Sequence, residues 1–241
     1  MFCVVLNTLQ EFDSFFTPSE LFTQTILHDQ KSMAGEFDIF YILSSLSKRR
    51  PIFVSEADFQ LELAWEIKLR YPDVVIRLEY TPVFDKNMHL DILAVRDNAW
   101  IPLELKYKTK GCEKVMNGET FILKNHGAHD MNRYLFWKDV GRIERVKRET
   151  DHFLEGYAIM LTNEKLYWES GADGISKDFT LRQGVEKHGL LQWAGQAKTA
   201  SQKQVKDPIM LEGHYLEDWQ DYSRLDNTNT GMFKVLVNRI H

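Results

Sequence analysis

The sequence predicts an α/β protein, tending to α+β, in which a mixed β-sheet core is flanked by helices and extended by additional C-terminal strands. With 241 residues, of which 44% are hydrophobic, the chain is long enough to bury one sizeable core. Its middle part shows apolar patterns in the order helix, three strands, helix, strand, which is typical of a mixed sheet with helices on its faces. The sequence shows no internal repeat, low-complexity tract or Gly/Ser linker, so residues 1–241 are predicted to form a single domain.

The N-terminal part is predicted to be helical. Residues 1–50 form an expected helical extension, and its strongest apolar segment, FDIFYILSSLSKRR, ends before Pro51. A further helix is predicted over SEADFQLELAWEIKLRYP, residues 55–72, because Ser55 and Asp58 resemble a capping box and the Tyr-Pro pair ends the pattern.

Three strands are predicted next, at residues 74–80, 89–97 and 100–108. The tight turn Arg-Asp-Asn-Ala joins the last two strands into a hairpin. After a loop rich in Gly, Asn and His, residues 129–149 show the apolar spacing of a long amphipathic helix, and residues 156–163 have the composition of a buried strand.

The expected core therefore spans residues 51–163. Residues 164–241 are predicted to be a C-terminal elaboration packed on this core. In it, GHYLEDWQDYS and MFKVLVNRI have the pattern of added strands, which we expect to form a C-terminal β layer whose role is left open.

Charge is distributed unevenly along the chain. The formal net charge of −5 argues against a protein that coats nucleic acid without specificity. Between Pro102 and Arg148, however, there are 11 Lys and Arg against 6 acids, which leaves −10 for the remainder. This segment forms either ordinary solvated faces or one face positive enough to hold a polyanion.

Cysteine content and hydropathy indicate the compartment. Cys3 and Cys112 cannot form a disulfide framework, and neither has a second cysteine or histidine at metal-ligand spacing. No apolar run approaches the about 20 residues that span a bilayer, and the start MFCVVLNTLQ lacks a basic segment ahead of its short apolar run. We expect a cytoplasmic protein with no membrane partner.

The segment IPLELKYKTK, residues 101–110, places charged side chains within an apolar strand. With a period of two, Leu105 points to one face while Glu104 and Lys106 point to the other. Hairpin pairing brings Asp91 of the preceding strand near these two residues. Two carboxylates in a partly buried site repel each other unless a cation lies between them, and Mg²⁺ needs only one or two carboxylates plus substrate phosphate and water.

The acid-x-Lys pattern alone is weak, because random order produces roughly two or three such triplets in a chain of this composition. Another triplet, Glu66-Ile67-Lys68, falls in the predicted helix. The alternative for Glu104 is a surface ion pair with a neighbouring lysine, and for Asp91 a role at a strand edge or turn.

HLDILAV followed by WIPLELKYKT resembles the PD-(D/E)XK nuclease superfamily, the restriction-endonuclease-like fold of many restriction endonucleases, junction resolvases and repair nucleases. The resemblance covers about residues 55–163. SEADFQLELAWEI, GETFILKNHGAHD, RYLFWKDVGRIE, GYAIMLTNEKLYW and WQDYS are further similar to an uncharacterised bacterial group of restriction-endonuclease-like chains. The chain departs from the pattern at Leu90, where the superfamily has its proline.

The resemblance implies a metal-dependent deoxyribonuclease. Asp91 and Glu104 would ligate Mg²⁺ (or Mn²⁺), helped by the Leu105 carbonyl, and Lys106 would position the attacking water and stabilise charge on the scissile phosphate. This division of labour is chemically sound, because a bound metal lowers the pKa of its water while a lysine supplies a positive point charge with three donors. The implied reaction is phosphodiester hydrolysis of DNA by an endonuclease of restriction or repair type.

Superfamily members often add an acid from the first helix. Glu56 shares a helical stripe with Phe59 and Ile67 and should face the sheet, whereas Glu62 points elsewhere, so Glu56 is the predicted additional catalytic acid. The alternative is that Glu56 only stabilises the helix, because an acid in the first turn interacts favourably with the helix dipole. Gln60, one turn on, is a candidate to hold a metal-bound water.

The loop after the third strand adds auxiliary candidates. Lys124, Asn125 and His126 are expected near the phosphate if the loop returns to the site. His126 and His129 also make an H-x-x-H pair that suggests zinc, but without a clear third ligand. The candidate contacts to DNA are basic residues, which have the alternative role of pairing with nearby acids: Lys108, Lys110, Arg133 and Arg142.

Two other classes of function stay open at this point. The chain is either a nuclease or a noncatalytic DNA-binding or protein-interaction domain that retains the fold. A third possibility is an unrelated α/β enzyme in which the strand phase differs. DNA is the expected partner, and a homodimer is left open.

Overall fold

The computed structural model describes residues 36–172, 174–195 and 207–241. Residues 38–241 form one compact unit. In the described ranges, every helix is too short or too polar to span a bilayer. Most of the predicted N-terminal extension, residues 1–50, lies outside the described residues.

A mixed sheet of six strands forms the centre of this unit. Neighbouring strands are antiparallel except β3 and β6, which are parallel. The mixed sheet predicted from the sequence is therefore confirmed. In spatial order the strands are β1 (Val75–Tyr80), β2 (Leu90–Arg96), β3 (Ala99–Lys108), β6 (Gly156–Thr162), β10 (Met232–Ile240) and β9 (Gln220–Arg224).

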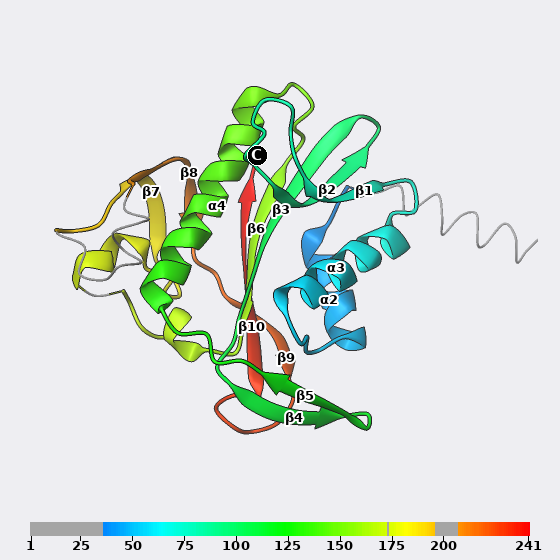
Figure 1. Ribbon diagram of the computed structural model, residues 1–241, viewed down its shortest axis with the longest axis vertical. Helices are drawn as coiled ribbons and strands as arrows, with labels where there is room; N and C mark the ends of the chain where they lie inside the picture. Colours follow the sequence, from blue (N-terminus) through cyan, green and yellow to red (C-terminus); the bar gives the residue numbers. More distant parts are fainter. Residues whose placement is uncertain (1–35, 173, 196–206) are drawn as a thin grey trace, which may run out of the picture. The chain divides into compact units, whose positions relative to one another are not determined.

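Helices cover both faces of this sheet (Figure 1). The helix α3 (Glu56–Arg70) packs against β1, β2 and β3, and the longer α4 (His129–Glu149) packs on the other face against β3, β6 and β10. The strand β6 is buried along its whole length between them. This arrangement explains why its sequence is a continuous apolar run rather than an alternating one.

The helix α2 (Ile39–Arg49) corresponds to the apolar segment predicted before Pro51. It packs against α3 and β9, and the Tyr222 hydroxyl donates to the Arg50 carbonyl at 2.9 Å. This part of the predicted N-terminal extension therefore belongs to the same compact unit as the core.

Local residue patterns determine several element boundaries. The Ser55 side chain accepts the Asp58 N–H and caps α3, as predicted. Between β2 and β3, Asp97 and Asn98 have φ of 49° and 70°, the pair of positive values that a two-residue type I′ hairpin turn requires.

Two parts of the chain differ from the prediction. The segment before α4 is not all loop, because β4 (Cys112–Met116) and β5 (Glu119–Leu123) form a hairpin around Asn117-Gly118. The C-terminal strands are not one separate layer, because β9 and β10 extend the central sheet.

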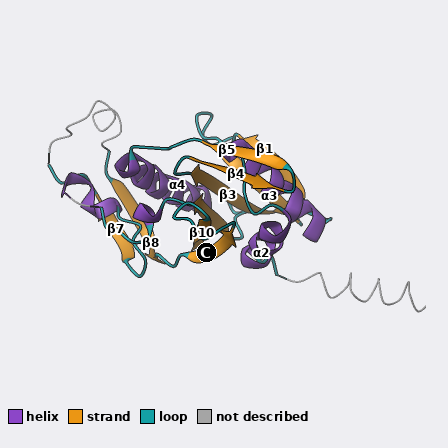
Figure 2. Ribbon diagram, turned by 90° about the horizontal axis from the view of Figure 1, so that it is seen from below, coloured by secondary structure: helices purple, strands orange, loops and turns teal. Residues whose placement is uncertain are grey.

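Among the described C-terminal strands, β7 (Glu186–Leu191) and β8 (Ile209–Leu216) form a second sheet, which packs on α4 on the side away from the central sheet (Figure 2). Short 3₁₀ helices, η1 (Lys165–Tyr167) and η2 (Gly174–Phe179), lie between β6 and β7.

Glu144 fixes β8 to α4. Its buried Oε1 accepts the N–H groups of Glu212 and Gly213 at 2.9 and 2.8 Å and the Tyr215 hydroxyl at 2.7 Å. We expect Glu144→Ala to lower the free energy of unfolding by at least about 3 kcal/mol, because three hydrogen bonds to a carboxylate are lost. Urea unfolding measures this change. The exposed Glu149→Ala on the same helix is the control, and an equal effect of both variants would contradict this role.

Candidate metal centre

The strand β3 continues beyond the end of its partner β2. Their pairing runs from Arg96–Ala99 to Ile92–Leu103, so the next backbone N–H groups on this side of β3 lie beyond the paired part of β2. Three side chains accept hydrogen bonds from these groups, and all three belong to residues predicted for the site. The contacts are Asp91 Oδ2 with Leu105 N at 2.6 Å, Glu56 Oε2 with Tyr107 N at 2.7 Å, and His126 Nδ1 with Thr109 N at 3.0 Å.

The predicted strand phase is confirmed. Glu104 and Lys106 face α4, where Glu104 Oε2 lies 2.7 Å from Arg142 Nη1 and Lys106 Nζ lies 2.5 Å from Asp139 Oδ2. Tyr107 faces the opposite side and its hydroxyl donates to the Phe53 carbonyl.

Asp91 lies beside Glu104. The β2–β3 register pairs Ile92 with Leu103 and so places Asp91 and Glu104 next in line. The two carboxylates are close enough for the charge of Asp91 to be one of the causes that raise the pKa of Glu104. The sequence-predicted pair is therefore brought together.

We define the β3 cluster as Asp91, Glu104, Lys106, Asp139 and Arg142. Asp139 and Arg142 both lie on α4, and Arg142 Nη1 is also 3.3 Å from Asp139 Oδ1. This contact links the Lys106–Asp139 pair to the Glu104–Arg142 pair. When all five groups are ionised, three carboxylates face two cations and the cluster carries a formal charge of −1. One divalent cation would change this charge to +1.

Burial makes the negative charge of the β3 cluster costly. It raises the pKa of Asp91 to about 6, a shift that the Leu105 N–H and Lys106 oppose and that Asp139 and Glu56 reinforce. Burial and then the charge of Asp139 hold the pKa of Glu104 well above its usual range, although Arg142 opposes them. A further cation among these carboxylates would stabilise their ionised forms.

The oxygen atoms present fit a magnesium ion. Glu104 Oε1 is buried and accepts no hydrogen bond from the part of the chain that the structure describes. The Leu105 carbonyl lies on the same side of β3 as the N–H group that binds Asp91, and Lys106 Nζ donates to it at 3.2 Å. Carboxylate and carbonyl oxygens are the ligands that Mg²⁺ takes.

Protein side chains alone do not complete such a site. Among the described residues, no group of three or more His, Cys, Asp or Glu is arranged to hold a metal ion. An ion at Asp91 and Glu104 would therefore need the Leu105 carbonyl and oxygens from water or phosphate, which is how Mg²⁺ is commonly held.

Residues from α3 support the site from its edge. Glu56 faces the sheet, as predicted from its helical stripe, and also binds Lys108 Nζ at 2.9 Å. Gln60 Nε2 donates to the Asp91 carbonyl at 2.7 Å and to Glu79 Oε1 at 2.8 Å. Gln60 is thus held beside Asp91 by two acceptors.

Glu79 is a site neighbour that the sequence did not reveal. It is a non-glycine residue with a φ of 50° outside any hairpin turn, a conformation that costs about 1 kcal/mol or more. Its contact with Gln60 places this strained residue next to Asp91.

The loop of Lys124, Asn125 and His126 returns to the end of β3. The Thr109 hydroxyl donates to the Lys124 carbonyl at 2.7 Å, and the Gly111 N–H donates to Asn125 Oδ1 at 3.3 Å. The loop therefore reaches the end of β3, and a contact of Lys124, Asn125 and His126 with a phosphate stays a prediction.

The two histidines of the H-x-x-H pair have different neighbours. His126 Nδ1 contacts Thr109, whereas His129 Nε2 lies 3.7 Å from Glu164 Oε2.

The predicted DNA contacts lie in different environments. Lys110 is exposed, Lys108 pairs with Glu56, and Arg142 pairs with Glu104. The prediction for Arg133 is wrong, because this side chain is 6% exposed and its Nη2 donates to the Leu166 carbonyl at 2.6 Å. The segment around η1 covers it.

Asp139 is the member of the β3 cluster that sequence reasoning missed. It lies on the buried stripe of α4 between Phe136 and Ile143, so an acid on an otherwise apolar stripe was the available signal. A buried acid of this kind requires a partner, which Lys106 provides.

Comparisons with protein-family models, with curated proteins and with solved structures found no significant match. The resemblance to PD-(D/E)XK nucleases therefore stays a prediction that only the residues of this chain support.

Proposed function

We propose that this protein is a metal-dependent deoxyribonuclease that hydrolyses phosphodiester bonds at the β3 cluster. The observation that carries the proposal is the convergence of Asp91, Glu104 and Lys106 at the open side of β3, with one buried Glu104 oxygen left without a hydrogen bond. Asp91, Glu104 and the Leu105 carbonyl would hold Mg²⁺ or Mn²⁺.

Charge supports a phosphodiester as the substrate. With one divalent cation the β3 cluster would carry +1, which a phosphodiester of charge −1 neutralises. The bound metal would supply a water of lowered pKa and offset charge on the phosphate. The formal charge of the metal-bound β3 cluster therefore favours a phosphodiester as the substrate.

Lys106 would stabilise charge on the scissile phosphate and orient the attacking water. Its ammonium is held by Asp139 at 2.5 Å and by the Leu105 carbonyl at 3.2 Å, so both contacts fix it beside the proposed metal ligands. Such a fixed donor costs little reorganisation when charge develops in the transition state.

Asp139 contributes through Lys106 rather than by contact with the substrate. It is 3% exposed and also lies 3.3 Å from Arg142 Nη1. We therefore assign Asp139 as a positioning residue.

We favour an endonuclease acting on DNA in the cytoplasm, with Gln60 placed to hold a metal-bound water and Lys110 to contact the DNA backbone. A second copy of the chain is an additional partner in this proposal if both strands are cut.

Incubation with supercoiled plasmid and with labelled duplex, nicked, branched and single-stranded oligonucleotides tests the proposal. We expect cleavage with Mg²⁺ or Mn²⁺ and none with EDTA. If no substrate is cut, and if calorimetry shows that DNA binds equally well to wild type and Asp91→Ala with no effect of Mg²⁺, the chain is instead a noncatalytic DNA-binding domain.

A further inference from the structure

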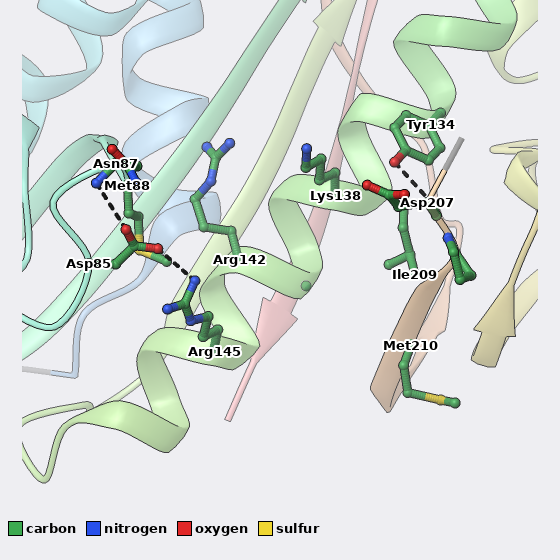
Figure 3. A pocket seen from close by; sticks show the side chains of 12 residues that line it. Asp85, Asn87, Met88, Tyr134, Lys138, Arg142, Arg145, Asp207, Ile209 and Met210 are labelled. Atoms are coloured by element: carbon green, nitrogen blue, oxygen red, sulfur yellow. Dashed lines mark hydrogen bonds and ion pairs between the residues drawn. The ribbon is translucent and has the colours of Figure 1, made fainter. Parts of the chain in front are cut away.

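A groove of about 450 Å³ runs along α4 next to the β3 cluster (Figure 3). One side carries the cations Lys138, Arg142 and Arg145, which follow one another at helical spacing and so share a face of α4. The groove is lined on its other sides by the loop before β2 and by the start of β8.

Arg142 connects this groove to the proposed metal centre. Its side chain lines the groove, and its Nη1 lies 2.7 Å from Glu104 Oε2. If one phosphate of a nucleic acid strand lies at Glu104, the neighbouring nucleotide of that strand is therefore within reach of the groove.

The cations of the groove differ in their partners. Arg145 is paired with Asp85 at 2.6 Å and Arg142 with Glu104 of the β3 cluster at 2.7 Å, and Asp207 is the other acid of the lining. Lys138 is exposed and makes no ion pair with the part of the chain that the structure describes. An anion beside Lys138 and Arg142 would be favoured.

Apolar side chains also line the groove, with Met88 next to Asp85 and with Ile209 and Met210 on the other side of the α4 cations (Figure 3). Met88 and Ile209 are 5% and 8% exposed, whereas Met210 is 60% exposed. Methionine adapts its shape to flat or irregular ligands, including the faces of aromatic rings. The lining thus combines a place for a phosphate with a place for a base.

The volume of the groove fits a single nucleotide and not a DNA duplex. It lies in the range of about 300–1,000 Å³ that is typical of sites for small organic ligands. In a duplex the bases are stacked and paired, so only an unpaired nucleotide presents a base that can enter such a groove.

We propose that this groove binds one unpaired nucleotide of the substrate strand, next to the phosphodiester that is cut. Its phosphate binds Lys138 and Arg142, and its base lies against Met88, Ile209 and Met210. This inference rests on the proposed function, and it makes single-stranded or locally unpaired DNA the preferred substrate class.

Calorimetry in EDTA, where no cleavage occurs, tests the groove separately from catalysis. The ligands are deoxythymidine 3′,5′-bisphosphate, thymidine and inorganic phosphate. We expect the bisphosphate to bind more tightly than either fragment, and Lys138→Ala to weaken it by at least about tenfold, because one charge-assisted hydrogen bond is lost. Met210→Asp should weaken it as well. Lys147→Ala, an exposed lysine of α4 outside the groove, is the matched control and should leave binding unchanged.

Three results would overturn the inference. The first is no binding of the bisphosphate, and the second is an equal effect of Lys138→Ala and Lys147→Ala. The third is binding of a hexaglutamate peptide as tight and as dependent on Lys138 as that of the nucleotide, which would indicate an acidic protein partner. If the wild type cleaves DNA while any of these holds, the nuclease proposal stands and the groove proposal fails. If Lys138-dependent binding is found without cleavage of any DNA, the groove proposal stands and the nuclease proposal fails.

Discussion

Replacing Lys106 by methionine is expected to lower the rate of Mg²⁺-dependent DNA cleavage by about 100-fold to 1,000-fold, the usual effect of removing a positioned donor from a developing negative charge. Methionine keeps the length of the side chain but has no charge. Single-turnover cleavage of a labelled oligonucleotide measures the effect.

A design with a second substitution separates catalysis from folding. Lys106→Met leaves Asp139 as a buried carboxylate with only Arg142 near it, and breaking a buried pair costs about 3–5 kcal/mol. The double variant Lys106→Met/Asp139→Asn removes both charges and should recover much of the stability, but none of the activity. Lys86→Met, in an exposed loop, is the control. Recovery of cleavage in the double variant would show that Lys106 acts only through the fold.

Replacing Asp91 by asparagine is expected to change activity and stability in opposite directions. Loss of one metal ligand should lower cleavage by at least about 1,000-fold, because the metal supplies several kcal/mol of charge stabilisation. The metal-free protein should become more stable by roughly 3 kcal/mol above pH 6, since burial raises the pKa of Asp91 from 3.8 to about 6. Asparagine can still accept the Leu105 N–H.

The sign of the pH dependence follows from this shift. Between pH 4 and 6 the folded protein keeps a proton on Asp91 that the unfolded chain has released, so the contribution of Asp91 to stability is lost as the pH rises through this window. The difference between Asp91→Asn and wild type should therefore be near zero at pH 4 and grow towards pH 7. Urea unfolding in EDTA measures it. Asp151→Asn, on an exposed turn, should show no such growth. If Asp91→Asn is less stable than the wild type at pH 7, the conclusion that the buried charge of Asp91 destabilises the metal-free protein is contradicted.

The sequence predicted the elements that local patterns determine. Glu104 and Lys106 interrupt an alternating apolar strand, so their common face followed from the pleat alone, and the residues of α4 followed from its apolar spacing. Glu56 was identified for the same reason, because its helical stripe includes side chains that are fully buried on the sheet.

The features that depend on contacts between distant segments were not predicted. Asp139 and Arg142 reach β3 only because α4 crosses that face of the sheet, and nothing near them in sequence specifies this crossing. The burial of Arg133 depends on a segment more than thirty residues away. Strand order has the same origin, since β10 pairs with β6 across about seventy residues of chain.

The hairpin of β4 and β5 was missed for a different reason. Its strands are short, and their exposed side carries the apolar Val115 and Ile122 next to polar residues, so the alternation of apolar and polar residues was weak. The dipeptide Asn117-Gly118, with φ of 51° and 82°, was the signal that would have identified it.

A crystal of the protein soaked in Mn²⁺ and measured at a wavelength where manganese scatters anomalously tests the metal centre most directly. An ion at this centre predicts an anomalous peak with carboxylate oxygens of both Asp91 and Glu104 and the Leu105 carbonyl at about 2.1 Å. A peak elsewhere, or no peak beside Asp91 and Glu104, would contradict the metal centre and with it the proposed nuclease.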